Sequence, residues 1–122
     1  MSNELFNQML SAYDLATHQQ KRNATFEVNQ QIILAGLYNG GFFNEAAFYG
    51  GTCLRIFHGL QRFSEDMDFS LLAPSQDFDF TQYFQPMVDQ FAMVGREVEI
   101  KKKDDISFCS CNRVTWSHLC HC

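Results

Sequence analysis

A short segment near the middle of the chain alternates acidic and apolar residues with a period of two. In residues 66–71, Asp66 and Asp68 alternate with Met67 and Phe69. Because successive side chains of a β-strand point to opposite faces, this alternation predicts a strand with both aspartates on one face. Cα atoms two residues apart on a strand are separated by about 6.5–7 Å, so two such carboxylates can converge on divalent ions. The segment therefore constrains the fold to one that contains a sheet with a polar face.

A pair of glycines lies upstream of this strand, directly before a segment with helical spacing. Gly50 and Gly51 lack a Cβ atom, so their backbone can approach a phosphate closely. Amide groups at the start of the following helix, expected over residues 52–57, would point at the anion. The Thr52 hydroxyl adds a donor, and Arg55, one turn further along, is placed to reach a phosphate.

Each of these features also has a purely structural interpretation. A Gly-Gly turn before a helix is most often only a turn, and Asp-x-Asp on a strand is most often a solvated face. Arg55 and Arg62 are of a type usually found at the surface, and Ser64 fits a turn. The combination within one compact unit favours a phosphate cradle that faces a metal site.

The remaining pattern predicts helices packed on a small sheet. Apolar residues recur at helical spacing in three segments, which are 3–20, 25–38 and 80–91. The apolar face of the first helix is expected to hold Leu5, Met9, Ala12 and Ala16. Glycines at positions 40–41 and 59 are expected helix stops, and Pro86 marks the expected start of the regular part of the third long helix. Two further strands are expected over 46–49 and 96–102. The order helix, helix, strand, short helix, strand, helix, strand predicts a mixed α/β layer of the α+β class.

Composition limits the size and the environment of this fold. The chain has 122 residues, of which 46% are hydrophobic, which suffices for one modest domain. The formal net charge of -5 means that a nucleic-acid partner would need a local basic patch. Residues 1–10 lack the basic flank and the apolar run of an export signal, and no segment approaches the length of a membrane helix. We therefore expect a cytoplasmic protein with no membrane contact.

Two stretches of this region resemble the signature of the AbiEii/AbiGii-type nucleotidyltransferases. These are toxin components of bacterial type IV toxin–antitoxin and abortive-infection systems, within the DNA polymerase β-like nucleotidyltransferase superfamily. The stretches are residues 50–55, Gly-Gly-Thr-Cys-Leu-Arg, and residues 62–69, Arg-Phe-Ser-Glu-Asp-Met-Asp-Phe. The superfamily pattern is Gly followed by Gly, Ser or Thr, then a spacer, then Asp-x-Asp or Asp-x-Glu. The match is specific over residues 48–71 and weaker over 25–103.

The resemblance implies a role for each matching position in the signature. Gly50, Gly51 and Thr52 would hold the triphosphate of an incoming NTP. Asp66 and Asp68 would bind Mg²⁺ ions.

Further positions follow from the same resemblance. Arg62 and Ser64 would shape the loop or touch phosphate. The superfamily usually has a third carboxylate on a later strand, which Glu99 fits, with Glu97 as the second choice and a solvated strand residue as the plain alternative. Family members transfer a nucleotide from an NTP to an acceptor, for some the 3′ end of tRNA, and a cognate antitoxin is usually encoded nearby.

The end of the chain departs from the family pattern. Family members are generally about twice as long, with a helical C-terminal half, so we expect residues 1–105 to be a partial nucleotidyltransferase domain of a truncated protein with reduced or no activity. Residues 106–122 are expected to be an irregular tail that holds four of the five cysteines. Its Cys-x-Cys pairs and two histidines offer a zinc site, although the spacing is not that of a usual zinc finger. We favour a lost reading frame near Asp105 over the zinc site, and disulfides are not expected in a cytoplasmic protein. The rival functions are a non-catalytic nucleotide- or antitoxin-binding remnant and a zinc-stabilised interaction module.

Overall fold

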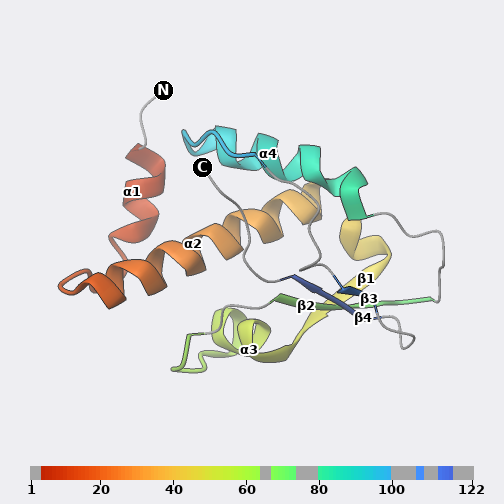
Figure 1. The fold of residues 1–122 in the computed structure, drawn as a ribbon, viewed down its shortest axis with the longest axis horizontal. Coiled ribbons are helices and arrows are strands. Elements are labelled where there is room, and N and C mark those ends of the chain that lie inside the picture. Colours follow the sequence, from red (N-terminus) through yellow and green to blue (C-terminus); the bar gives the residue numbers. More distant parts are fainter. Residues whose placement is uncertain (1–3, 64–66, 74–79, 100–106, 109–112, 117–122) are drawn as a thin grey trace.

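The protein is a mixed assembly of helices and one antiparallel sheet (Figure 1). The computed structural model describes residues 4–63, 67–73, 80–99, 107–108 and 113–116. In chain order the elements are α1 Glu4–Leu10, α2 His18–Asn39, the 3-10 helix η1 Phe42–Asn44, β1 Ala46–Tyr49, α3 Gly50–His58, β2 Met67–Leu71, the 3-10 helix η2 Phe80–Tyr83, α4 Phe84–Met93, β3 Ser107–Phe108 and β4 Arg113–Trp116. The α+β class expected from the sequence is confirmed.

The start of the chain forms two helices, so the single helix expected over 3–20 is wrong. Helix α1 ends at Leu10, and α2 begins only after Thr17, whose side chain accepts a hydrogen bond from the backbone N–H of Gln20. The Gln20 side chain accepts from the Thr17 backbone N–H in return, which completes a capping box. The expected apolar face is confirmed only at Met9, which packs against the core. Leu5, Ala12 and Ala16 are exposed, whereas Phe6 is buried in the core.

Helix α2 is the central element and extends beyond both ends of the expected 25–38 segment. Ile33 and Leu37 are completely buried, as their spacing predicted, whereas Phe26 is only half-buried. The helix ends at Asn39, directly before the two glycines, so the expected glycine stop is confirmed. Of the two, Gly41 adopts the left-handed conformation, with a φ of 83°. In Figure 1, α2 and α4 lie on one side of the sheet. Helix α3 is joined to α2 by the ion pair between Arg55 and Glu27.

The sheet has the strand order β1-β2-β4-β3, and its paired strands are antiparallel. The register pairs Phe48 with Phe69 and Tyr49 with Asp68. Burial along β2 alternates as the sequence predicted, with Met67, Phe69 and Leu71 buried and the residues between them half-buried. Since directly paired residues share a face, Asp68 and Tyr49 lie on the face opposite to the core.

The C-terminal part of the sheet differs from expectation. Residues 96–98 are irregular and Glu99 forms only a single bridge, so the strand expected from Arg96 is wrong over this described part, while 100–102 lie outside the described residues. The backbone N–H of Arg96 instead donates to the Phe91 carbonyl at the end of α4. Strand β2 pairs with β1 along one edge and with β4 along the other. Strand β4 lies in the segment that was expected to be irregular. Its Val-Thr-Trp sequence is rich in strand-forming residues.

The core is an aromatic and aliphatic cluster between α2, α4 and the inner face of the sheet. Phe42 is at its centre, with ring centroids 5.0 Å from Phe69, 5.1 Å from Tyr83 and 5.4 Å from Phe80. The start of α4 at Phe84 places Pro86 in the first turn, where proline is tolerated, so the sequence prediction for this helix is confirmed.

Truncation of Phe42 tests the position of this core. Phe42→Ala removes a fully buried ring and its edge contacts, and it should lower the free energy of unfolding by about 3–5 kcal/mol. The matched control is Phe57→Ala, since Phe57 is 64% exposed and should cost about 1 kcal/mol or less. Urea unfolding of both variants measures the difference, and equal losses would contradict the assigned core.

Tyr83 provides a pH test of the same cluster. Its hydroxyl donates a hydrogen bond to the Glu45 carboxylate, and burial together with this carboxylate raises the pKa of Tyr83 to about 12. The folded protein therefore holds this proton more tightly than the unfolded chain, whose tyrosine pKa is about 10. This contribution to stability is complete below about pH 10 and is lost as the pH rises toward about 12. The free energy of unfolding should fall over this window by less in Tyr83→Phe than in the wild type, and identical pH profiles from urea unfolding would refute the assignment.

Candidate functional site

The glycine turn and the carboxylate strand predicted from the sequence meet at one point. Gly50 is the first residue of α3 and has a φ of 87°, a conformation that favours glycine. A Cβ atom built on Gly50 would lie 2.8 Å from Oδ2 of Asp68. The Asp68 carboxylate therefore lies directly against the backbone of the turn, although the two residues are far apart in sequence.

The first turn of α3 contains two more of the predicted nucleotide-binding residues. Gly51 is half-buried, and Thr52 is 1% exposed. Tyr49 is the N-cap residue, and its side chain makes no capping hydrogen bond to the helix. The N-terminus of α3 and the Asp68 carboxylate therefore lie side by side.

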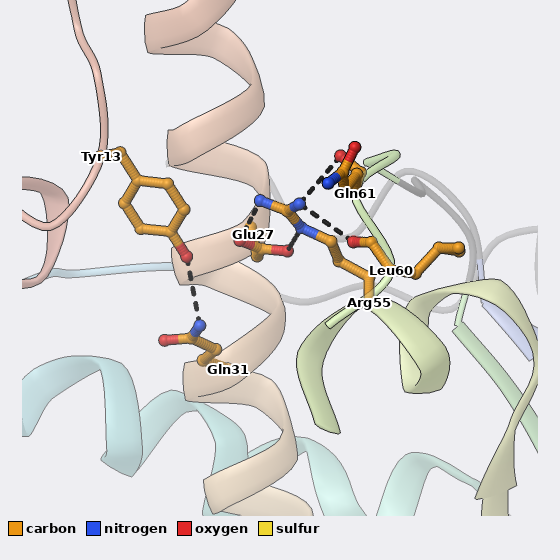
Figure 2. Close-up of polar contacts among 6 residues, drawn as sticks. All are labelled: Tyr13, Glu27, Gln31, Arg55, Leu60 and Gln61. Atoms are coloured by element: carbon orange, nitrogen blue, oxygen red, sulfur yellow. Dashed lines mark hydrogen bonds and ion pairs between the residues drawn. The ribbon is translucent and has the colours of Figure 1, made fainter. Parts of the chain in front are cut away.

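Arg55 does not point toward this turn. Its Nε donates to Oε1 of Glu27 on α2 at 2.7 Å, and its Nη1 donates to the carbonyls of Leu60 at 3.0 Å and Gln61 at 2.9 Å. The guanidinium also lies 3.9 Å from the ring centroid of Phe63. The structure therefore engages Arg55 with α2 and with the loop after α3 (Figure 2).

The remaining predicted residues are distributed differently. Arg62 is exposed in the loop that follows α3. Glu97 and Glu99 are exposed. Ser64 and Asp66 lie outside the described residues. Within the described ranges no three His, Cys, Asp or Glu side chains gather closely enough to hold a metal ion.

Sequence reasoning missed the acid that binds Arg55. Glu27 is 5% exposed although it is charged, and it lies on the buried stripe of α2 between Ala24 and Val28. An acidic residue inside an apolar helical stripe was the available signal, because a buried carboxylate requires a partner.

Sequence reasoning also missed Tyr13, whose ring lies on the side of Glu27 away from Arg55 in Figure 2. Gln31 donates to the Tyr13 hydroxyl at 3.2 Å (Figure 2). Burial, followed by a hydrogen bond to Glu27 and the charge of that carboxylate, raises the pKa of Tyr13 well above its usual range. Tyr13 thus remains a neutral phenol beside the ion pair at physiological pH.

An apolar cavity of about 580 Å³ lies between α2, η1, β1 and α3. It is lined by Gln31, Leu34, Ala35, Tyr38, Asn39, Phe43, Phe48, Ile56 and Phe57. Phe48 points to the opposite face of the sheet from Tyr49 and Asp68. The cavity is therefore separate from the contact between Gly50 and Asp68.

Gly50 and Gly59 form a matched pair for testing that contact. Both have positive φ, so alanine at either position should cost about 1–2 kcal/mol in stability. A Cβ at Gly59 would meet no atom within 4 Å, whereas one at Gly50 would displace the Asp68 carboxylate. We expect Gly50→Ala alone to shift the ¹³C carboxyl resonance of Asp68 in NMR spectra. An equal shift in Gly59→Ala would show that the contact is not specific.

Comparison with known families agrees with this geometry. The family model described as "Nucleotidyl transferase AbiEii toxin, Type IV TA system" matches residues 32–108, which include both Gly50 and Asp68. No curated protein and no solved structure matches the chain. In the described part, no helix is long and apolar enough to cross a membrane. Because the family model matches more than half of the 122 residues, the chain belongs to the AbiEii family of nucleotidyltransferase toxins of type IV toxin–antitoxin systems.

Proposed function

We propose that this protein transfers a nucleotide from an NTP to an RNA acceptor in a Mg²⁺-dependent reaction, with the 3′ end of tRNA as the acceptor. The observation that carries the proposal is the contact of the Asp68 carboxylate with the backbone of Gly50 at the start of α3. It joins a carboxylate to a helix N-terminus, as a metal–triphosphate site requires.

The donor set fits magnesium. The absence of a Cβ atom at Gly50 lets the Asp68 carboxylate lie against the turn, and a carboxylate oxygen is a ligand type that Mg²⁺ prefers. Asp66 and Asp68 would hold the ions, with Glu99 as the third carboxylate. When bound, such ions supply charge stabilisation to the attacking oxygen and to the departing phosphate.

The chain's own residues would orient the nucleotide. Backbone amides of Gly50 and Gly51 would donate to the triphosphate, and the buried Thr52 would fix the first helical turn. Arg62, which is exposed, and Ser64 would contact phosphate from the loop that precedes β2. The acceptor hydroxyl would attack the α-phosphate, and pyrophosphate would leave.

The family context extends the proposal to the cell. A toxin of this type would act on RNA in the cytoplasm, and a cognate antitoxin would oppose it. Capping the 3′ end of tRNA would block aminoacylation and stop growth.

The test is transfer of label from radioactive NTPs to purified tRNA in the presence of Mg²⁺. Asp68→Asn should lower the rate by about 100-fold or more, because it removes a metal ligand whose charge stabilisation is worth several kcal/mol. The control is Asp89→Asn, since Asp89 is exposed on α4 and accepts a hydrogen bond from Gln85 in the same helix. Its rate should stay at the wild-type level.

Two results would contradict the proposed function. Transfer that survives Asp68→Asn would overturn the assigned site. Binding of Mg-NTP without transfer to any RNA would favour a nucleotide-binding protein without catalysis.

A further inference from the structure

One guanidinium group connects the three segments around the candidate site. Arg55 belongs to α3 and binds Glu27 of α2 through Nε and, at 3.5 Å, through Nη2. Its Nη1 holds two consecutive carbonyls of the loop after α3, those of Leu60 and Gln61. The ring of Phe63, further along the same loop, covers the guanidinium. All three nitrogens of the group therefore have acceptors within the protein.

The connection is enforced by burial. The Glu27 side chain is 6% exposed and the Arg55 side chain 20%, so the carboxylate is almost completely shielded from water and the guanidinium is only partly exposed. The planar guanidinium fork fits a carboxylate and two carbonyls in one fixed orientation. Lysine would retain the charge but could not reproduce this set of contacts.

The tethered segments are those that carry the candidate site. Arg55 lies just over one turn beyond Gly50 and Gly51, on the same short helix. The first residue of that helix, Gly50, lies against the Asp68 carboxylate of β2. A shift of α3 would therefore be passed to the glycine turn and to its contact with Asp68.

We propose, on the basis of the function proposed above, that Glu27 and Arg55 are positioning residues that fix the glycine turn and the Asp68 strand relative to each other. Glu27 holds Arg55 against α2, and Arg55 holds the loop that leads into β2. The pair acts through the backbone and does not touch the metal or the nucleotide. This role differs from the phosphate contact that the sequence predicted for Arg55.

The experiment measures Mn²⁺ binding to the full chain, without nucleotide or RNA, from the electron paramagnetic resonance signal of the free ion. Wild type is compared with Arg55→Lys, with Glu27→Gln, with the double variant Glu27→Gln/Arg55→Met and with Asp68→Asn, each at a temperature at which circular dichroism shows it folded. The KM for NTP of Arg55→Lys is measured separately in the transfer assay. The matched control is Asn39→Ala, which breaks a 2.7 Å side-chain contact between α2 and Gln90 of α4.

The expected result separates positioning from stability. Arg55→Lys and the double variant should bind Mn²⁺ about tenfold more weakly, as outer contacts of metal sites typically do when altered. The double variant leaves no unpaired buried charge, so its melting temperature should recover relative to Glu27→Gln while its Mn²⁺ affinity does not. Asn39→Ala should bind Mn²⁺ as the wild type does.

Three outcomes would overturn the inference. If Mn²⁺ affinity recovers together with the melting temperature, the pair is only structural. If Arg55→Lys leaves Mn²⁺ affinity unchanged and raises only the KM for NTP, Arg55 contacts phosphate instead. If Asp68→Asn does not weaken Mn²⁺ binding, the proposed metal site is wrong and the positioning role falls with it. In the first two cases the proposed function survives, so the two failures are distinguishable.

Discussion

The pairing of Tyr49 with Asp68 across β1 and β2 determines where the candidate site lies. Because paired residues share a face, this register places the aspartate beside the last residue of β1. The chain then turns at Gly50 with a positive φ, and α3 starts with its first backbone atoms against the Asp68 carboxylate. A slip of one residue would turn Asp68 into the core and Phe69 toward solvent. The buried position of Phe69 therefore fixes the register that the polar site requires.

A second constraint is the buried charge of Glu27. Leaving a carboxylate almost fully buried without a cation costs far more than an exposed ion pair can contribute. The cation that meets this need comes from α3, within the stretch that resembles the nucleotidyltransferase signature, whereas Glu27 lies on α2, outside that stretch. Helix α2 thus stabilises the signature region through the ion pair between Glu27 and Arg55 as well as through packing. Tyr13 lies near the same carboxylate, whose charge helps to raise the pKa of the Tyr13 hydroxyl.

Local patterns predicted the elements that local physics determines. The alternation in 67–71, the helix stop at Gly59 and the first-turn position of Pro86 follow from side-chain period and backbone sterics, and each is confirmed. The break after Leu10 was not predictable from period alone, because it depends on the capping box of Thr17 and on the burial of Phe6 against distant residues. The partner of β2 was missed for a related reason. Pairing with β4 is a choice between distant segments, which no local pattern encodes.

The two faces of β2 separate the requirements of folding from those of the candidate chemistry. Phe69 lies 5.0 Å from the ring of Phe42 and 5.3 Å from that of Phe48, and aromatic pairs of this kind each add about 0.5–1.5 kcal/mol beyond their buried area. Asp68, on the other face, is half-buried and contributes no apolar area to that cluster. A change at Asp68 that preserves its size therefore tests the proposed ion binding while β2 stays anchored by the core on its other face. A change at Phe69 would instead release the strand, and the carboxylate would lose its position only as a consequence of unfolding.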